Sequence, residues 1–187
     1  MTTAFWKLCW VLVLGVGLTA CGSDTAVDAA ETPSQSDTAA EMATEETPLA
    51  EALADVTDGY FELKDALVQT DYNLAKTAAT AFQETVNEID WAAGSATAAG
   101  NKITSAARVI AAAGDVEAQR TAFSELSNAL AGALEKYGTA GETIYLQHCP
   151  MAFDNTGADW LSDSEEIMNP YFGDKMLHCG KVDRVLQ

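Results

Sequence analysis

Basic residues are scarce in this sequence. The 187 residues include 10 Lys and Arg against 28 Asp and Glu, which gives a formal net charge of −18 at pH 7. Nucleic-acid binding and docking on anionic lipid both need a cationic surface, so the charge argues against either partner. The acidic excess is explained most simply by solubility, although an acidic surface also attracts cations.

Residue patterns that support catalysis are also missing. The chain has two histidines, His148 and His178, and neither belongs to a Glu-x-x-His pair, which excludes the di-iron sites found inside some helix bundles. No Ser/His/Asp set, paired catalytic acids or phosphate-binding glycine loop is visible. We therefore predict that the protein is not an enzyme.

The apolar stretch at the N-terminus is too short for a membrane span. It runs from Leu8 to Ala20 after a single cation, Lys7, whereas a spanning helix needs ~20 residues. This pattern is typical of a secretion signal. One interpretation is an ordinary signal peptide that happens to contain a cysteine, and the other is the signal peptide of a lipoprotein.

The end of this stretch, Leu18-Thr19-Ala20-Cys21, resembles the lipobox of bacterial lipoproteins. The resemblance implies that residues 1–20 are a lipoprotein signal peptide and that Cys21 becomes the lipid-modified N-terminus. Gly22 differs from the aspartate that the sorting rule of this class associates with inner-membrane retention. We therefore expect a lipid-anchored protein at the outer membrane that faces the periplasm.

Residues 21–47 carry acids but no Lys or Arg, and almost no large apolar side chain. Such a segment cannot bury enough apolar surface to offset the entropy of ordering it. We predict a disordered acidic tether between the lipidated Cys21 and a folded domain that begins at Pro48.

From Pro48 onward, apolar residues recur every three or four positions, as on one face of a helix. Thr47 is suited to be the N-cap of the first helix, with Pro48 at its first position. The predicted buried positions of this helix are Leu49, Leu53, Val56, Tyr60, Leu63 and Leu67. Asp71 is suited to cap a second helix, with Leu74, Ala78, Phe82, Val86 and Ile89 as its predicted buried positions.

Two further helices follow. The third is rich in alanine and ends at Gly114, and the fourth is capped by Asp115 and ends at Gly138. The fourth helix has Val116, Gln119, Phe123, Leu126, Leu130, Leu134 and Tyr137 on its apolar face. We therefore predict an all-α domain over residues 48–187, an up-down four-helix bundle.

The pattern changes after Gly141. A short β-prone stretch, Ile144–Leu146, stands alone, and Ser162–Glu165 forms a capping-box pattern that predicts a short helix ending before Pro170. We expect a loop-rich C-terminal segment that folds over one end of the bundle.

Two short clusters in this segment gather the residues with metal-binding chemistry: His148-Cys149-x-Met151 and Met176-x-His178-Cys179. In an extended stretch Cys149 and Met151 share a side, and in a helical turn Met176 and Cys179 share a face. Two thiolates and two thioethers favour Cu(I). Zinc would require both cysteines and both histidines.

A disulfide between Cys149 and Cys179 is the other interpretation, since paired cysteines in an oxidising compartment usually form one. In that case Met151 and Met176 would fill space in the core. The residue types alone leave the disulfide and the metal site open. Trp160, Tyr171 and Phe172 lie between the two clusters in the sequence, and we expect them to shield the site from water.

The order of these motifs resembles the family called domain of unknown function 3347. The resemblance covers roughly Leu53 to Val185. It rests on Cys-Pro-Met-Ala, Gly-Ala-x-Trp-Leu-Ser, Ile-x-Asn-Pro-Tyr-Phe-Gly and Met-Leu-x-Cys-Gly-x-Val, and on Gln119-Arg120-x-x-Phe123 in the helical part. Members of the family occur as secreted proteins or lipoproteins and at the C-terminus of heavy-metal efflux adaptors.

The resemblance implies metal handling, with copper or silver as the metal. Carried onto this sequence, the Cys and Met pattern of the family falls on Cys149, Met151, Met176 and Cys179, and His148 and His178 lie outside it. The chain lacks the barrel and hairpin domains of an adaptor. We therefore expect a lipoprotein that binds or buffers Cu(I) or Ag(I) and holds it or passes it to an efflux system. The alternative is a metal-free interaction module stapled by the Cys149–Cys179 disulfide.

Overall fold

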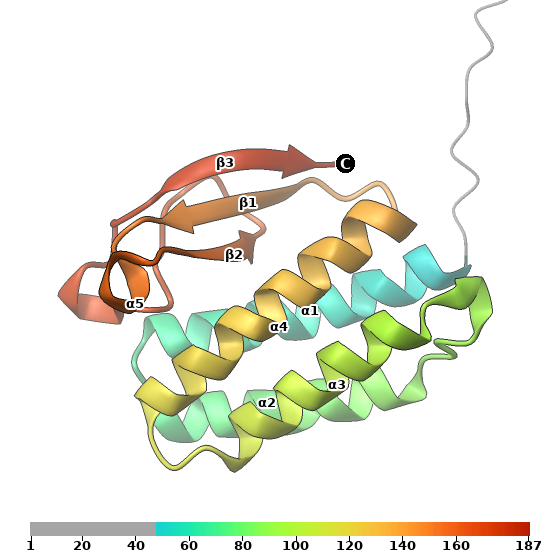
Figure 1. Cartoon of the computed structure of the whole chain (residues 1–187), viewed down its shortest axis with the longest axis horizontal. Helices are drawn as coiled ribbons and strands as arrows, with labels where there is room; N and C mark the ends of the chain where they lie inside the picture. Colours follow the sequence, from blue (N-terminus) through green and yellow to red (C-terminus); the bar gives the residue numbers. More distant parts are fainter. Residues whose placement is uncertain (1–47) are drawn as a thin grey trace, which may run out of the picture. The chain divides into compact units, whose positions relative to one another are not determined.

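A computed structural model describes residues 48–187, which contain four long helices (Figure 1). The helices are α1 (Pro48–Val68), α2 (Tyr72–Glu88), α3 (Thr97–Ala112) and α4 (Val116–Tyr137). Each helix packs against the next, and α1 also contacts α4. The four predicted helices are therefore confirmed.

The helix boundaries follow from local chemistry. The Asp71 carboxylate accepts a hydrogen bond from the Leu74 amide at 2.9 Å, and Asp115 accepts one from the Ala118 amide at 2.8 Å. Each carboxylate satisfies an amide that has no partner within its own helix. Gly138, with φ of 99°, ends α4 in a conformation that other residues avoid.

The predicted apolar face is correct for α1 and only partly correct for α2. All six predicted positions of α1 are buried. In α2 the buried residues are Ala75, Ala79, Phe82 and Val86, whereas Leu74 is 44 % exposed. The prediction was wrong for Leu74 because it favoured the larger side chain for the buried face. Helices that pack closely leave room for small side chains, so the adjacent Ala75 is buried instead.

The C-terminal part contains a sheet that the sequence analysis did not predict. Strands β1 (Ile144–Cys149), β2 (Ala158–Ser162) and β3 (Lys181–Leu186) pair antiparallel in the order β2-β1-β3. The all-α assignment is therefore correct for the bundle and wrong for this region. Strand β1 shows no alternation of apolar and polar residues because both of its faces are covered.

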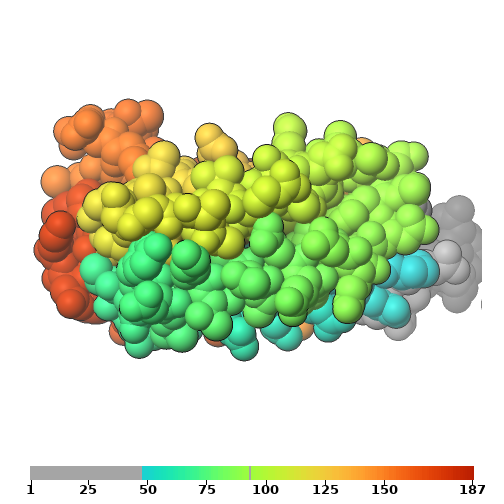
Figure 2. All heavy atoms as spheres, turned by 90° about the horizontal axis from the view of Figure 1, so that it is seen from below, coloured from blue at the N-terminus to red at the C-terminus, as the bar shows by residue number. Residues whose placement is uncertain are grey.

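The sheet lies along the flank of the bundle, with β2 against α4 (Figure 1). The Leu161 amide donates a hydrogen bond to the Tyr60 hydroxyl of α1 at 3.1 Å, which connects the sheet to the helices. The connection between β2 and β3, residues 163–180, reaches the end of the bundle where α1 ends and α4 begins. Figure 2 shows C-terminal residues, in red, at one end of the helices. The expectation of a segment over one end holds for this connection but not for the sheet.

The short helix predicted after Ser162 does not form. The Ser162 hydroxyl accepts from the Ser164 amide at 3.2 Å, and the Ser164 hydroxyl accepts from the Glu166 amide at 3.1 Å. The carbonyls of Ser164 and Glu166 accept from the side-chain amide of Gln147. Serine-stabilised turns therefore replace the helix, because β1 supplies the partner for these carbonyls.

No helix within residues 48–187 is both long and apolar enough to cross a membrane. The predictions of a signal peptide over residues 1–20, a lipidated Cys21 and a tether over residues 21–47 lie outside the described residues, as does Thr47 as the cap of α1.

Candidate functional site

The two cysteines of the C-terminal motifs lie in contact. Cys149 is the last residue of β1, and Cys179 lies just before β3, the neighbouring strand. Their Sγ atoms are 2.9 Å apart, and both are free thiols. The antiparallel pairing of His148 with Lys181 brings the end of β1 beside the start of β3 and so joins the two sequence clusters.

Asn169 holds the segment that carries Cys179. Its side-chain oxygen accepts hydrogen bonds from the amides of Tyr171 and Phe172, at 2.8 and 3.3 Å. Its side-chain nitrogen donates to the Cys179 carbonyl at 2.7 Å, and its backbone amide donates to the Leu177 carbonyl at 2.7 Å. One buried side chain therefore fixes both the turn at residues 169–173 and the backbone at the thiol.

The residue after the thiol must be glycine. Gly180 has φ of 149°, and a Cβ atom there would lie 2.8 Å from the Trp160 ring and 3.0 Å from the His148 carbonyl oxygen. The backbone of Cys179–Gly180 therefore approaches β1 and β2 more closely than a larger residue would allow.

The contact between the thiols raises the pKa of Cys179 to about 11. The hydrogen bond with Cys149 is the largest cause, followed by burial, and a backbone hydrogen bond from Met151 acts in the opposite direction. The effects that raise the pKa favour the neutral thiol. A metal ion that binds here must therefore displace protons, as thiolate ligation requires.

The two methionines lie together on the adjoining surface. Met151 and Met176 both line a pocket of about 530 Å³, whose lining includes neither cysteine. Met151 is 48 % exposed. The four sulfurs of the predicted site therefore fall into two neighbouring pairs, a pair of thiols of which Cys149 is buried and Cys179 is partly exposed, and a pair of thioethers at a surface pocket.

Both histidines are engaged through Nδ1. His148 Nδ1 lies 2.6 Å from an Asp159 carboxylate oxygen across the β1–β2 pair, and His178 Nδ1 donates to the Ile167 carbonyl at 2.9 Å. Among residues 48–187, no group of three or more His, Cys, Asp and Glu side chains converges as a metal site. The two-cysteine, two-histidine set that zinc would need is not assembled there.

The aromatic residues between the clusters are partly where the sequence analysis placed them. Trp160 and Tyr171 are buried, with ring centroids 6.0 Å apart, and the Tyr171 hydroxyl donates to the Asp159 carbonyl. Burial raises the pKa of Tyr171 well above its ordinary value, so the hydroxyl stays neutral. Phe172 is only partly buried and lines the methionine pocket.

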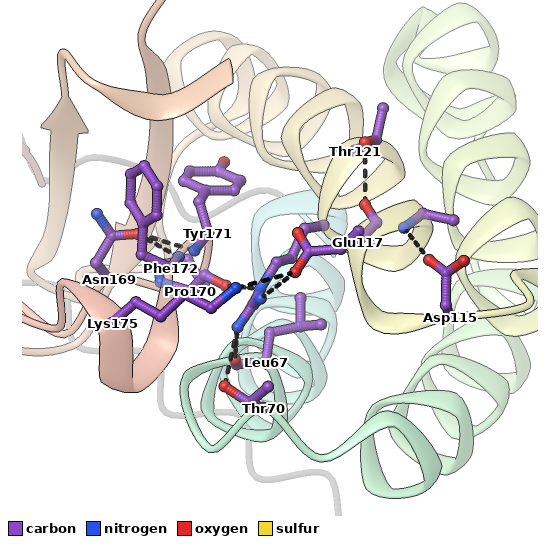
Figure 3. A network of polar contacts seen from close by, with 12 residues as sticks. Leu67, Thr70, Asp115, Glu117, Thr121, Asn169, Pro170, Tyr171, Phe172 and Lys175 are labelled. Carbon is purple, nitrogen blue, oxygen red and sulfur yellow. Dashed lines mark hydrogen bonds and ion pairs between the residues drawn. The ribbon is translucent and has the colours of Figure 1, made fainter. Parts of the chain in front are cut away.

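The sequence analysis missed the role of Arg120. This buried side chain in α4 donates to the carbonyls of Pro170 and Leu67 and to the Thr70 hydroxyl, at 2.8, 3.2 and 3.0 Å, and pairs with Glu117 at 3.1 Å (Figure 3). It also forms part of the methionine pocket. An arginine directly after Gln119, at the apolar face of a helix, was the signal that could have identified it.

Comparison with known proteins agrees with the resemblance in the helical part. The family described as "Protein of unknown function (DUF3347)" matches residues 56–142, most of α1 and all of α2, α3 and α4. The Cys and Met motifs lie beyond the matched range. No curated protein and no solved structure matches the chain.

Proposed function

Taking as a premise that this chain belongs to the DUF3347 family through residues 56–142, we propose that it binds a soft monovalent metal ion, Cu(I) or Ag(I). The observation that supports this most is the pair of free thiols of Cys149 and Cys179, whose sulfurs are 2.9 Å apart. In this proposal the two thiolates hold the ion, and the thioethers of Met151 and Met176 are the weaker donors nearby.

The identity of the ion follows from the donors. Thiolates bind both Cu(I) and zinc, but a structural zinc site takes four Cys or His ligands, whereas thioethers are donors for Cu(I). The described residues offer no cluster of three or more His, Cys, Asp and Glu for zinc. Two thiolates are enough for a d¹⁰ monovalent ion, which accepts low coordination numbers.

The surroundings of the thiols favour retention of the ion. Cys149 is fully buried, and the indole of Trp160 packs where Gly180 leaves room beside the thiol segment. A dry shell limits access of water and of competing ligands to such a site. We propose that the protein buffers the metal or passes it to a heavy-metal efflux system.

The proposed location is the periplasmic face of the outer membrane, with Cys21 as the lipid anchor. The lipobox pattern at Leu18–Cys21 supports this part of the proposal. Stable attachment needs more than one acyl chain, which a fully processed lipoprotein cysteine carries. Replacing Cys21 with serine and fractionating cells tests it, because the variant should leave the membrane fraction, and continued membrane association would contradict the anchor.

The second candidate is a metal-free interaction module stapled by a Cys149–Cys179 disulfide. The same close contact of the two sulfurs favours it, because thiols this near each other can oxidise with little movement of the backbone. In an oxidising compartment this outcome competes directly with metal binding.

One experiment separates the two functions. Free thiols and bound Cu(I) are quantified on the mature protein prepared anaerobically, and again after oxidation. Metal binding by the dithiol predicts two reactive C-terminal thiols and one thiolate-bound Cu(I) per chain in the reduced protein, and loss of the thiols and of this thiolate-bound Cu(I) after oxidation. A reduced protein that binds no Cu(I) would favour the disulfide module.

A further inference from the structure

The methionine pocket has a composition of its own. Besides Met151 and Met176, its lining includes the aromatic rings of Phe153, Tyr171 and Phe172. Thioethers pack favourably against the edges of aromatic rings, so these rings can hold the two methionine side chains in place. The pocket therefore offers two soft donors among aromatic and charged side chains, separate from the thiols.

The chain is strained where it presents Met151. The next residues include Phe153, Asp154 and Asn155, with φ of 50°, 57° and 67°, so three successive non-glycine residues adopt the left-handed conformation. This conformation is sterically unfavourable for a residue such as Phe153, and Asp and Asn tolerate it better. The turn is closed by a hydrogen bond from the Gly157 amide to the Ala152 carbonyl at 2.9 Å.

This turn exposes apolar side chains beside the pocket. Met151 is 48 % exposed and Phe153 is 37 % exposed. Strained backbone that persists in a fold is a marker of functional positions. Here the strained residues follow Met151, whose exposed side chain an ion from solution can reach.

The charges around the pocket do not suit a hard cation. Arg120 and Lys175 both lie near the Glu117 carboxylate, at 3.1 and 3.9 Å, and Asp154 is the other acid of the lining (Figure 3). Two cations and two acids leave the lining with no net formal charge. A divalent ion such as Ca²⁺ needs several carboxylate oxygens, so the thioethers are the donors that distinguish this pocket.

The pocket adjoins the dithiol through one residue. Met151 contributes its side chain to the pocket, and its backbone forms a hydrogen bond to the thiol of Cys179. The residue that carries the Met151 thioether therefore touches the Cys179 thiol through its backbone.

We propose that Met151 and Met176 form a second, surface-accessible site that captures Cu(I) or Ag(I) and passes the ion to the thiols of Cys149 and Cys179. This rests on the proposed function of the dithiol. In the transfer, the ion leaves two neutral thioethers and binds two thiolates, and two protons pass to solvent. The oxidation state of the metal does not change.

The test is an Ag(I) titration by calorimetry on the mature chain, with Cys21→Ser in every sample so that this thiol does not bind the probe. One sample has the Cys149–Cys179 pair oxidised to a disulfide, and the other is reduced. The variant Met151→Leu/Met176→Leu removes the thioethers at nearly constant volume, so the fold should be retained. The control is Met168→Leu, a half-buried methionine outside the pocket lining.

The oxidised wild type should bind one Ag(I), at the two thioethers. The reduced wild type should bind two, and the ion at the dithiol should be bound more tightly than the ion at the thioethers. The double methionine variant should bind none when oxidised and one when reduced, and Met168→Leu should match the wild type. Loading of the dithiol, followed by the ultraviolet absorbance of the Cu(I)–thiolate bonds, should be slower in the double variant.

Two results would overturn parts of the account separately. An oxidised wild type that binds no Ag(I), or a double variant that binds as much as the wild type, would refute the methionine site. A reduced double variant that binds no more Ag(I) than its oxidised form would refute the dithiol site instead. Equal loading rates in wild type and double variant would refute the transfer step.

Discussion

Arg120 donates a hydrogen bond from Nε to the Pro170 carbonyl oxygen at 2.8 Å, and so joins α4 to the loop that carries the Tyr171 side chain. The same guanidinium donates to the Leu67 carbonyl at the end of α1 (Figure 3). A single buried side chain therefore links two helices to the segment that positions Cys179.

Arg120→Met should lower the free energy of unfolding by about 3 kcal/mol, because buried carbonyls lose their donor. Urea denaturation measures the change. Arg184→Met is the matched control: Arg184 pairs with Glu135 at 2.6 Å but is half exposed, so its loss should cost at most about 1 kcal/mol. Equal effects of the two substitutions would contradict the role of Arg120.

Leu63→Ala and Leu74→Ala should differ strongly, although both residues were predicted from the sequence to lie on a buried helix face. Leu63 is fully buried in α1, and its truncation should cost ~2–5 kcal/mol through lost contacts and a cavity. Leu74 is exposed in α2, and its truncation should change stability by less than about 1 kcal/mol. Thermal or urea unfolding of the two variants decides this. A large loss of stability in Leu74→Ala would show that the face of α2 carrying Leu74 is buried after all.

Asp154→Gly should stabilise the fold by up to about 1 kcal/mol. Asp154 has φ of 57°, in a region that glycine adopts without a steric penalty, and this gain exceeds the entropy that glycine loses on folding. Asp159→Gly, in the regular strand β2, is the control and should destabilise. A loss of stability in Asp154→Gly would show that the turn is not strained.

Alkylation of Cys179 should be slow at neutral pH and should rise toward pH 11. Its pKa of about 11 lies above the 9.0 of a free thiol, so the folded protein retains this proton more strongly than the unfolded chain. The corresponding stability is fully present below pH 9 and is lost as the pH rises through 11. Iodoacetamide reaction rates of the reduced protein, measured from pH 7 to 11, test this. A midpoint at or below pH 9 would contradict the contact between the thiols.

The helices could be predicted because their signals are local. Asp71 and Asp115 act as caps through amides three residues away, and the apolar spacing of α1 depends on one helix alone. The rotation of α2 could not be predicted, because the choice between Leu74 and Ala75 depends on how closely neighbouring helices approach.

The sheet and the division of the sulfurs depend on contacts between distant residues. The Gln147 side chain donates a hydrogen bond to the Ser164 carbonyl, which lies in the segment predicted to form a short helix. The Asn169 side chain donates one to the carbonyl of Cys179, ten residues along the chain. The sequence did predict that Cys149 and Cys179 converge, since both motifs place a thiol beside a methionine. It could not show that Met151 and Met176 face a pocket of their own, because that pocket forms only where residues 151–155, residues 171–176 and α4 meet in the fold.

The most direct test of the central claim is a Cu(I) competition titration with a chelator on reduced protein, carrying Cys21→Ser throughout. The variants are Cys149→Ser, Cys179→Ser, Met151→Leu, Met176→Leu, His148→Ala and His178→Ala. Thiolate ligation predicts that either serine variant nearly abolishes tight binding, the leucine variants reduce it less, and the alanine variants change it least. Greatest loss in the histidine variants, or no Cu(I) bound by the reduced wild type, would contradict the dithiol site.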